Sequence, residues 1–259
     1  MAATIVIDAG HGGSDGGAVY NGRLEKDDNL RLALAVGKRL EEAGYNVVYT
    51  RTEDVFDSPS EKARIANRSG ADFFVSFHRN SSPYANTYSG VETLVYSDSG
   101  VRGELARSVN EELEKAGFKN LGVTERKNLT VLKRTQMPAI LIEAGFINTD
   151  ADNKTFDENF SAIAQGIATG IERVVGGTTP STGGSTGNRY RVQTGLFRRY
   201  GNAQFMLQQL IEEGYEAEIR ERGEYFAVQV GNYLTPEDAR EAQTQLRNLG
   251  YDTLIVTGT

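Results

Sequence analysis

The 259-residue chain contains only two histidines, and each follows a short, mainly apolar run. His11 follows residues 4–10, and His78 follows residues 72–77. Histidine is the commonest neutral metal ligand in proteins, and the ends of neighbouring strands can bring two such side chains together. The placement of the two histidines therefore predicts a metal site.

A third ligand must come from a carboxylate. A catalytic zinc site usually takes three protein ligands and leaves a fourth position for water. The carboxylates that follow His11 are Asp15, Glu25, Asp27 and Asp28. We favour Glu25, which stands just before the first long helical pattern, where a turn can bring it back to the strand end. A carboxylate at a helix start also interacts favourably with the helix dipole, and on the residues alone this alternative stays open.

Glu143 interrupts residues 138–146, an apolar segment that otherwise suits a fully buried strand. Removing a carboxylate from water is costly unless the group is paired or functional. Glu143 is therefore interpreted as a general acid/base with a raised pKa beside the metal, with a structural ion pair as the alternative.

Glycines surround His11 in residues 9–17. A dinucleotide-binding fingerprint requires G-x-G-x-x-G, but the sixth position counted from Gly10 is Asp15. No Gly-Lys-Ser/Thr follows for a phosphate-binding loop. We interpret the glycines as residues that let the backbone turn tightly around a ligand held by His11.

The elements that must position these residues alternate between short apolar runs and longer helical patterns as far as residue 175. This order is typical of an α/β fold, a mostly parallel twisted sheet flanked by helices. Predicted strands span residues 4–8, 46–50, 72–77, 91–96 and 139–143, and predicted helices span residues 28–43, 60–69, 101–116 and 156–174. Predicted N-caps are Asp27 or Asp28, Ser60 and Asp157, and predicted left-handed residues after helix ends are Gly44, Gly70 and Gly117. Ligands of such sheets bind beyond the carboxyl ends of the strands, where His11, His78 and Glu143 fall.

A second domain is predicted after residues 176–188, which are small and polar and form a flexible linker. Residues 189–259 repeat at an offset of 36 positions, so that Gln193, Leu210 and Gly214 recur as Gln229, Leu246 and Gly250. Each copy has the pattern strand, helix, strand. The pair predicts a small α+β domain of order β-α-β-β-α-β, with a four-stranded antiparallel sheet backed by two helices.

Composition limits the possible partners. The net charge of −7 argues against nucleic acid, and residues 188–259, with 8 Arg, no Lys and 10 acidic residues, do not favour RNA binding. The absence of cysteine excludes disulfides and thiolate metal sites. No apolar stretch approaches the ~20 residues of a membrane-spanning helix, so no membrane span is expected. No export signal is visible, because the first residues lead directly into a strand that contains Asp8.

Residues 4–175 resemble the zinc-dependent N-acetylmuramoyl-L-alanine amidases of the type-3 family, which act in bacterial cell-wall turnover. The matching blocks are residues 7–18, Glu25-Lys26, Thr50-Arg51, Ala66-Asn67, residues 76–81 and residues 137–146. The resemblance implies that His11, Glu25 and His78 bind Zn²⁺ and that Glu143 is the catalytic carboxylate. Division of the chain at the linker gives domain boundaries at residues 1–175 and 189–259.

Residues 189–259 resemble the SPOR domain, a peptidoglycan-binding module, through residues 192–197 and 228–233. The alternative is a generic scaffold of the same topology whose aromatic residues pack its core. The two resemblances together imply that the partner is peptidoglycan, both its glycan strands and its stem peptides.

The implied activity is hydrolysis of the amide between N-acetylmuramic acid and L-alanine, with a suggested place in mother-cell lysis during sporulation. Only 64 residues separate His78 from Glu143, so we expect the regulatory helical insertion of some family members to be absent. Since no export signal is visible, we expect synthesis in the cytoplasm and action on the wall after release or leaderless export. A zinc peptidase that cuts within the stem peptide and a wall-binding protein without activity are the alternatives.

Overall fold

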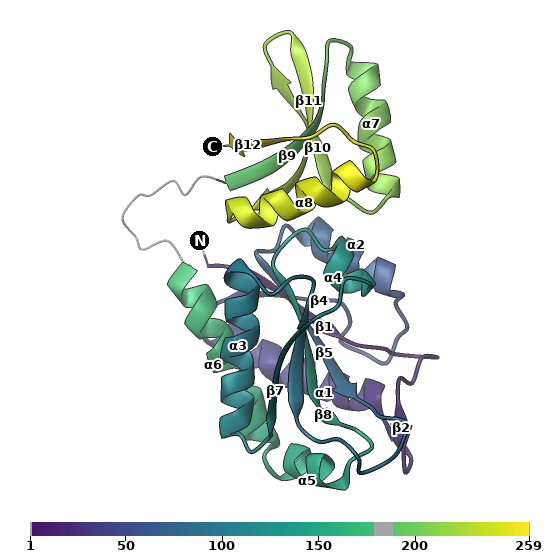
Figure 1. Ribbon diagram of the computed structural model, residues 1–259, viewed down its shortest axis with the longest axis vertical. Coiled ribbons are helices and arrows are strands. Elements are labelled where there is room, and N and C mark those ends of the chain that lie inside the picture. Colours follow the sequence, from purple (N-terminus) through teal and green to yellow (C-terminus); the bar gives the residue numbers. More distant parts are fainter. Residues whose placement is uncertain (1, 179–188, 259) are drawn as a thin grey trace. The chain divides into compact units, whose positions relative to one another are not determined.

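The computed structural model describes residues 2–178 and 189–258, which form two compact units (Figure 1). The first unit contains the elements from β1 to α6, and the second contains those from β9 to β12. Most of the predicted linker, residues 179–188, lies outside the described residues. Its first residues, 176–178, instead continue helix α6 (Phe160–Thr178), because the first helix-breaking proline after Val175 is Pro180.

A six-stranded sheet forms the centre of the first unit, in the order β4-β1-β5-β8-β6-β7. The strands are β1 (Thr4–Ala9), β4 (Asn46–Tyr49), β5 (Phe73–Asn80), β6 (Val91–Val95), β7 (Asn120–Glu125) and β8 (Ala139–Phe146). Strands β4, β1, β5 and β8 are parallel, while β6 is antiparallel to β8 and parallel to β7. The predicted mostly parallel sheet is therefore confirmed.

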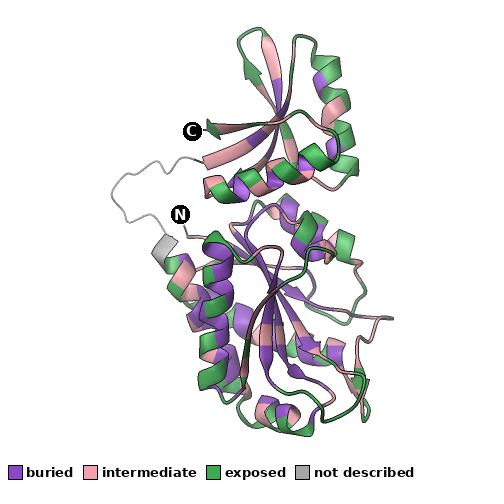
Figure 2. Ribbon diagram, in the orientation of Figure 1, coloured by how far each residue is buried: buried purple, intermediate pink, exposed green. Residues whose placement is uncertain are grey.

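Helices flank this sheet and bury its central strands. They are α1 (Glu25–Glu42), α2 (Pro59–Ser69), α3 (Gly100–Lys115), α4 (Thr130–Arg134), α5 (Asp150–Glu158) and α6, and a short hairpin, β2 (Val19–Tyr20) with β3 (Arg23–Leu24), precedes α1. Ile5, Phe74 and Ile142 are 0% exposed, as expected for strands covered on both faces, and Figure 2 shows the central strands as largely buried. Among the helices that the structure describes, none combines the length and apolar character needed to cross a membrane.

Two elements differ from the predictions. Strand β7 was not expected, because residues 120–125 contain a glycine and no run of apolar side chains. The predicted helix at residues 156–174 is two helices, α5 and α6, since the first ends with Asn159 outside the helical region at φ −106°.

The predicted N-cap residues are wrong, whereas the three glycines predicted to follow helix ends have the expected positive φ. Asp27 and Asp28 lie in the first turn of α1, Ser60 lies inside α2 and Asp157 lies inside α5. Helix α2 is capped by Ser58, whose side chain accepts a hydrogen bond from the Glu61 backbone, because Pro59 suits the first helical position and leaves the residue before it as the cap. Gly44, Gly70 and Gly117 have φ values of 93°, 63° and 109°.

The second unit confirms the predicted β-α-β-β-α-β order. Its elements are β9 (Arg189–Phe197), α7 (Tyr200–Glu212), β10 (Ala217–Arg222), β11 (Tyr225–Tyr233), α8 (Pro236–Asn248) and β12 (Leu254–Gly258). The sheet is antiparallel throughout, in the order β10-β11-β9-β12. The repeat positions Leu210 and Leu246 are both 0% exposed and belong to one core. The internal repeat thus corresponds to two similar units, whose helices α7 and α8 pack on one sheet.

Candidate metal centre

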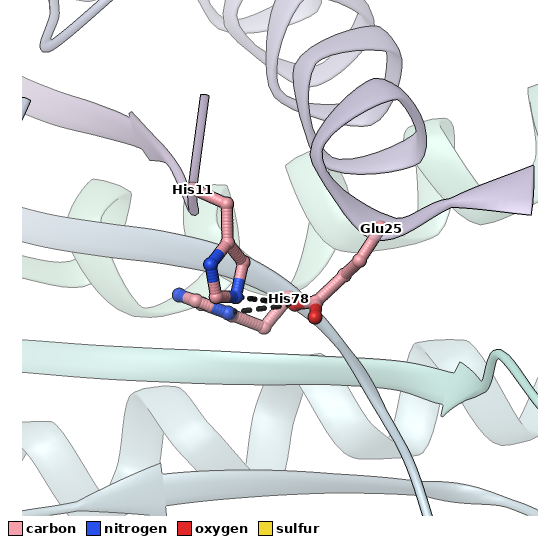
Figure 3. Close-up of side chains that lie close together, drawn as sticks. All are labelled: His11, Glu25 and His78. Atoms are coloured by element: carbon pink, nitrogen blue, oxygen red, sulfur yellow. Dashed lines mark hydrogen bonds and ion pairs between the residues drawn. The ribbon is translucent and has the colours of Figure 1, made fainter. Parts of the chain in front are cut away.

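His11, Glu25 and His78 come from three separate segments and meet near the carboxyl ends of β1 and β5 (Figure 3). His11 lies two residues beyond the end of β1, His78 lies near the end of β5, and Glu25 is the first residue of α1. One ligand atom from each side chain lies within 4.8 Å of the other two. The structure therefore brings together the three residues that the sequence predicted as metal ligands. His11, Glu25 and His78 are called the metal group below.

The geometry of this group suits a small cation. Glu25 Oε1 lies 2.9 Å from His78 Nδ1 and 3.2 Å from His11 Nε2. The two imidazole rings meet edge to face, with centroids 5.0 Å apart. Electron-rich nitrogen and oxygen atoms this close repel one another unless a proton or a metal ion lies between them. Two imidazoles and one carboxylate are also a known donor set of catalytic zinc.

Glycines leave the space that the ligand side chains occupy. A Cβ on Gly10 would lie 2.3 Å from the His78 ring, and a Cβ on Gly17 would lie 2.6 Å from Glu25 Oε2. His11 itself has φ 58°, in the left-handed region that non-glycine residues seldom adopt. The segment from Gly10 to Gly17 is therefore folded closely against the side chains of Glu25 and His78.

Asp15 orients His11 and is not a member of the metal group. Its Oδ2 atom lies 2.8 Å from His11 Nδ1, and its Oδ1 atom accepts a hydrogen bond from the Gly17 backbone. A carboxylate that accepts from one imidazole nitrogen leaves the other nitrogen free to bind a metal. Asp28, another carboxylate considered as third ligand, instead pairs with Arg23 and Arg79, at 2.7 Å and 2.6 Å.

Glu25 is held as a carboxylate although it is only 4% exposed. Burial by itself would raise the pKa of Glu25, but hydrogen bonds and charge from His11 and His78 outweigh burial and hold that pKa well below its usual range. The backbone N–H groups of Ala18 and Arg79 also donate to Glu25, at 2.9 Å and 3.2 Å. The carboxylate is thus prepared to bind a cation at neutral pH.

Glu143 lies on β8 directly beside His78, its register partner on β5. Neighbours in register project from the same face of a sheet, so the Glu143 carboxyl group lies on the side of the metal group. Burial raises the pKa of Glu143 to about 7, and the charges of Glu25 and Glu92 act in the same direction. Its Oε2 atom is buried without a hydrogen-bond partner among the described residues, and none of their Lys or Arg side chains forms an ion pair with it. The structural ion-pair alternative is therefore not supported.

The metal-free protein should lose stability as the pH rises from about 6.5 to about 9. Burial would lower the pKa of His11, but Glu25 and Asp15 raise it to about 9. Since the folded pKa lies above the unfolded value of about 6.5, this group contributes full stability below pH 6.5 and loses it toward pH 9. One such proton changes the free energy of unfolding by at most ~1.4 kcal/mol per pH unit. Urea unfolding with a chelator at pH 6, 7.5 and 9 tests this, and a free energy that rises with pH contradicts it.

The fold and the site together define a class: an α/β protein whose sheet carries, at its carboxyl edge, a three-residue group that could bind a metal beside a buried carboxyl group. Comparison with known proteins is more specific. The model of the N-acetylmuramoyl-L-alanine amidase family matches residues 5–173, and that of the SPOR domain matches residues 186–257.

Individual relatives agree with these matches. The sporulation-specific N-acetylmuramoyl-L-alanine amidase of Bacillus subtilis (strain 168) is 35% identical over 219 residues, which cover 82% of each chain. The N-acetylmuramoyl-L-alanine amidase CwlM of Bacillus licheniformis is 34% identical over 219 residues, covering 82% of this chain and 83% of its own. The crystal structure of the N-acetylmuramoyl-L-alanine amidase from Clostridium difficile 630 superposes with a TM-score of 0.65 at 34% identity, covering 69% of this chain and 99% of its own.

The chain therefore belongs to the N-acetylmuramoyl-L-alanine amidase family. It is a cell-wall amidase with a C-terminal SPOR domain, and its partner is peptidoglycan. The resemblance inferred from the sequence blocks is confirmed. The individual roles of His11, Glu25, His78 and Glu143 stay predictions.

Proposed function

We propose that this amidase depends on zinc, with His11, Glu25 and His78 as ligands and Glu143 as the catalytic carboxylate. The observation that carries the proposal is the convergence of two imidazoles and a carboxylate within 4.8 Å. Two features of the surroundings support it. Asp15 contacts His11 Nδ1, the ring nitrogen that faces away from Glu25. Glu143, whose Oε2 atom has no hydrogen-bond partner among the described residues, lies on β8 beside His78 on β5.

Glu143 carries the proton transfers of the proposed mechanism. Zinc held by His11, Glu25 and His78 would supply a Lewis acid, whose chemistry is to lower the pKa of a bound water toward ~7 and to polarise a carbonyl group. The oxygen of a water molecule attacks the carbonyl carbon, and Glu143 accepts the proton that this water loses. When the C–N bond breaks, Glu143 returns this proton to the departing amine of L-alanine. A carboxyl group with a pKa of about 7 suits both steps, because it exchanges protons readily near neutral pH.

We further propose that residues 1–175 form the catalytic domain, whose last helix continues to Thr178, and that residues 189–259 form the peptidoglycan-binding domain. Holding the enzyme on the wall raises the local concentration of substrate without adding a catalytic contact. The 35% identity to a sporulation-specific amidase supports a role in sporulation. We propose that this role is lysis of the mother cell.

Digestion of purified peptidoglycan tests the activity and its metal dependence together. We expect new L-alanine amino termini and peptide-free glycan strands by mass spectrometry, abolished by a chelator and restored by added zinc. New ends inside the stem peptide would identify a peptidase, and no new ends would identify a wall-binding protein without activity. Amide cleavage that survives complete metal removal would contradict the zinc dependence alone.

A further inference from the structure

At the end of β1, the three consecutive carbonyl groups of Ala9, Gly10 and His11 accept hydrogen bonds from two buried cations. Arg51 Nε donates to the Ala9 carbonyl at 3.1 Å, and Arg51 Nη2 donates to the Gly10 carbonyl at 3.0 Å. Lys62 Nζ donates to the Ala9 carbonyl and, at 3.5 Å, to the His11 carbonyl. Both cations are only 3% exposed. The backbone that carries His11 is therefore held from inside the protein.

The two cations differ in what else they bind. Lys62 forms an ion pair with Asp8 at 2.9 Å, and Asp8 also accepts hydrogen bonds from Thr50 and Ser76. Arg51 instead donates to the carbonyls of Lys26, at 2.9 Å, and Glu53, at 3.0 Å. Lys62 thus belongs to the hydrogen-bond network around Asp8 of β1. Arg51 instead contacts the start of α1, the segment that carries Glu25.

One nitrogen of Arg51 joins the two segments. Nη2 donates both to the Gly10 carbonyl, one residue before His11, and to the Lys26 carbonyl, one residue after Glu25. Asn29 Nδ2 provides a parallel connection, since it donates to the Gly10 carbonyl at 3.3 Å and to Glu25 Oε1 at 3.2 Å. A guanidinium group is rigid and planar, so hydrogen bonds in its plane fix the relative positions of the groups they bind.

The backbone at His11 needs such support. Its φ of 58° is uncommon for a residue with a side chain, and such conformations persist only where the surroundings over-determine them. Without the Arg51 hydrogen bonds, the Gly10 carbonyl would keep only Asn29 Nδ2 as a side-chain donor, at 3.3 Å, and the backbone that leads into His11 would be held less firmly. The imidazole would then move relative to Glu25, its partner at 3.2 Å.

We propose that Arg51 is a positioning residue that sets the separation of the segments carrying His11 and Glu25. It acts on the backbone beside each ligand and on neither ligand's side chain. The inference rests on the proposed metal role of these two residues. Because the fork geometry of the guanidinium does the positioning, a lysine at this place would keep the charge and lose the effect.

The test compares Arg51→Lys with Arg39→Lys, a matched control. Arg39 also donates to a backbone carbonyl, that of Ala35 at 2.8 Å, but it lies in the last turn of α1, the end opposite Glu25. The readouts are the zinc dissociation constant by chelator competition, the visible spectrum of the Co²⁺-loaded protein and the thermal midpoint of the metal-free protein. We expect Arg51→Lys to raise the zinc Kd by about 10- to 100-fold and to change the Co²⁺ spectrum. Arg39→Lys should alter neither.

A zinc Kd and Co²⁺ spectrum of Arg51→Lys equal to those of the unchanged protein would overturn the inference, whatever happens to the thermal midpoint. If Arg51→Lys folds only with metal, the rise of its midpoint with zinc concentration still gives the Kd. A variant that stays unfolded in excess zinc would assign Arg51 a structural role instead. An unchanged protein that binds no zinc would overturn the proposed function and this inference with it.

Discussion

Replacing Glu143 by glutamine is expected to lower the rate of amide cleavage by about 10²- to 10⁴-fold, the usual contribution of a general acid/base. Glutamine has nearly the same shape but cannot accept the proton of the attacking water. Glu143 lies beside the metal group and is not one of its three members, so the variant should retain its zinc. The comparison of kcat and zinc content on one soluble muropeptide substrate tests both parts.

Stability provides an independent readout for the same variant. Because burial raises the pKa of Glu143 to about 7, the buried carboxylate destabilises the folded metal-free protein increasingly as the pH rises from about 4.5 to 7. A neutral glutamine removes this effect, so Glu143→Gln should unfold at a higher temperature than the unchanged protein at pH 8. A structural ion pair would have the opposite consequence, since its loss lowers the midpoint.

Glu125→Gln is the matched control for both measurements. Glu125 lies exposed at the end of β7, where it accepts a hydrogen bond from the Asp98 backbone at 3.0 Å and pairs with Lys127 at 3.3 Å. Neither activity nor zinc content should change in this variant. Full activity of Glu143→Gln would remove Glu143 from the mechanism, and loss of its zinc would make Glu143 a ligand.

The sequence predicted those parts of the site that depend on strand ends. His11, His78 and Glu143 follow or interrupt apolar runs, and parallel strands bring such positions to one edge of a sheet. The choice of Glu25 among the neighbouring carboxylates has no such strand-end signal. It depends on the hairpin of β2 and β3, which returns the chain so that the Glu25 backbone donates to the Ala18 carbonyl at 3.0 Å. Two-residue strands leave almost no periodic signal.

Other features could not be predicted from the pattern of residue types. Charged side chains are normally exposed, so a rule based on residue type places Lys62 and Arg51 at the surface, whereas both are buried against backbone carbonyls. Local pattern does not record this burial, because the Ala9 carbonyl that both side chains contact lies 42 residues from Arg51 and 53 residues from Lys62 along the chain. Glu92 carried a usable signal, since it interrupts the buried strand β6 as Glu143 interrupts β8. The structure shows its carboxylate accepting from Asn80 and Thr124.

The internal repeat made the second domain more predictable than the first. Two copies in one sequence act as an alignment, because positions that recur, such as Leu210 and Leu246, must serve the same core. No such comparison exists within the first domain. There, the direction of β6 and the break between α5 and α6 depend on tertiary packing, which local pattern does not record.

Substitution of His78 by alanine is expected to abolish both zinc binding and amide cleavage, since two ligands remain of the three. Removal of a residue that only hydrogen-bonds to a metal ligand typically weakens metal binding by about 10- to 100-fold, and the loss of zinc affinity in His78→Ala should be larger. Asp15→Asn provides that comparison in the same protein, because Asp15 contacts His11 Nδ1 and lies outside the ligand group. Metal content, Kd and cleavage of peptidoglycan are measured for both variants.

The metal-free stability of His78→Ala separates ligand loss from unfolding. Glu25 is buried, and without the His78 ring its carboxylate loses the hydrogen-bond partner at 2.9 Å, which lowers the midpoint. His78→Gln offers a side-chain N–H group to Glu25 in place of the imidazole and should recover part of this stability, yet it should not recover tight zinc binding, because an amide is a poor zinc ligand. Zinc affinity therefore reports the ligand role of His78, and the midpoint reports its contact with Glu25. Zinc bound at full strength by His78→Ala would remove His78 from the site, and equal losses in His78→Ala and Asp15→Asn would reduce His78 to an orienting partner like Asp15.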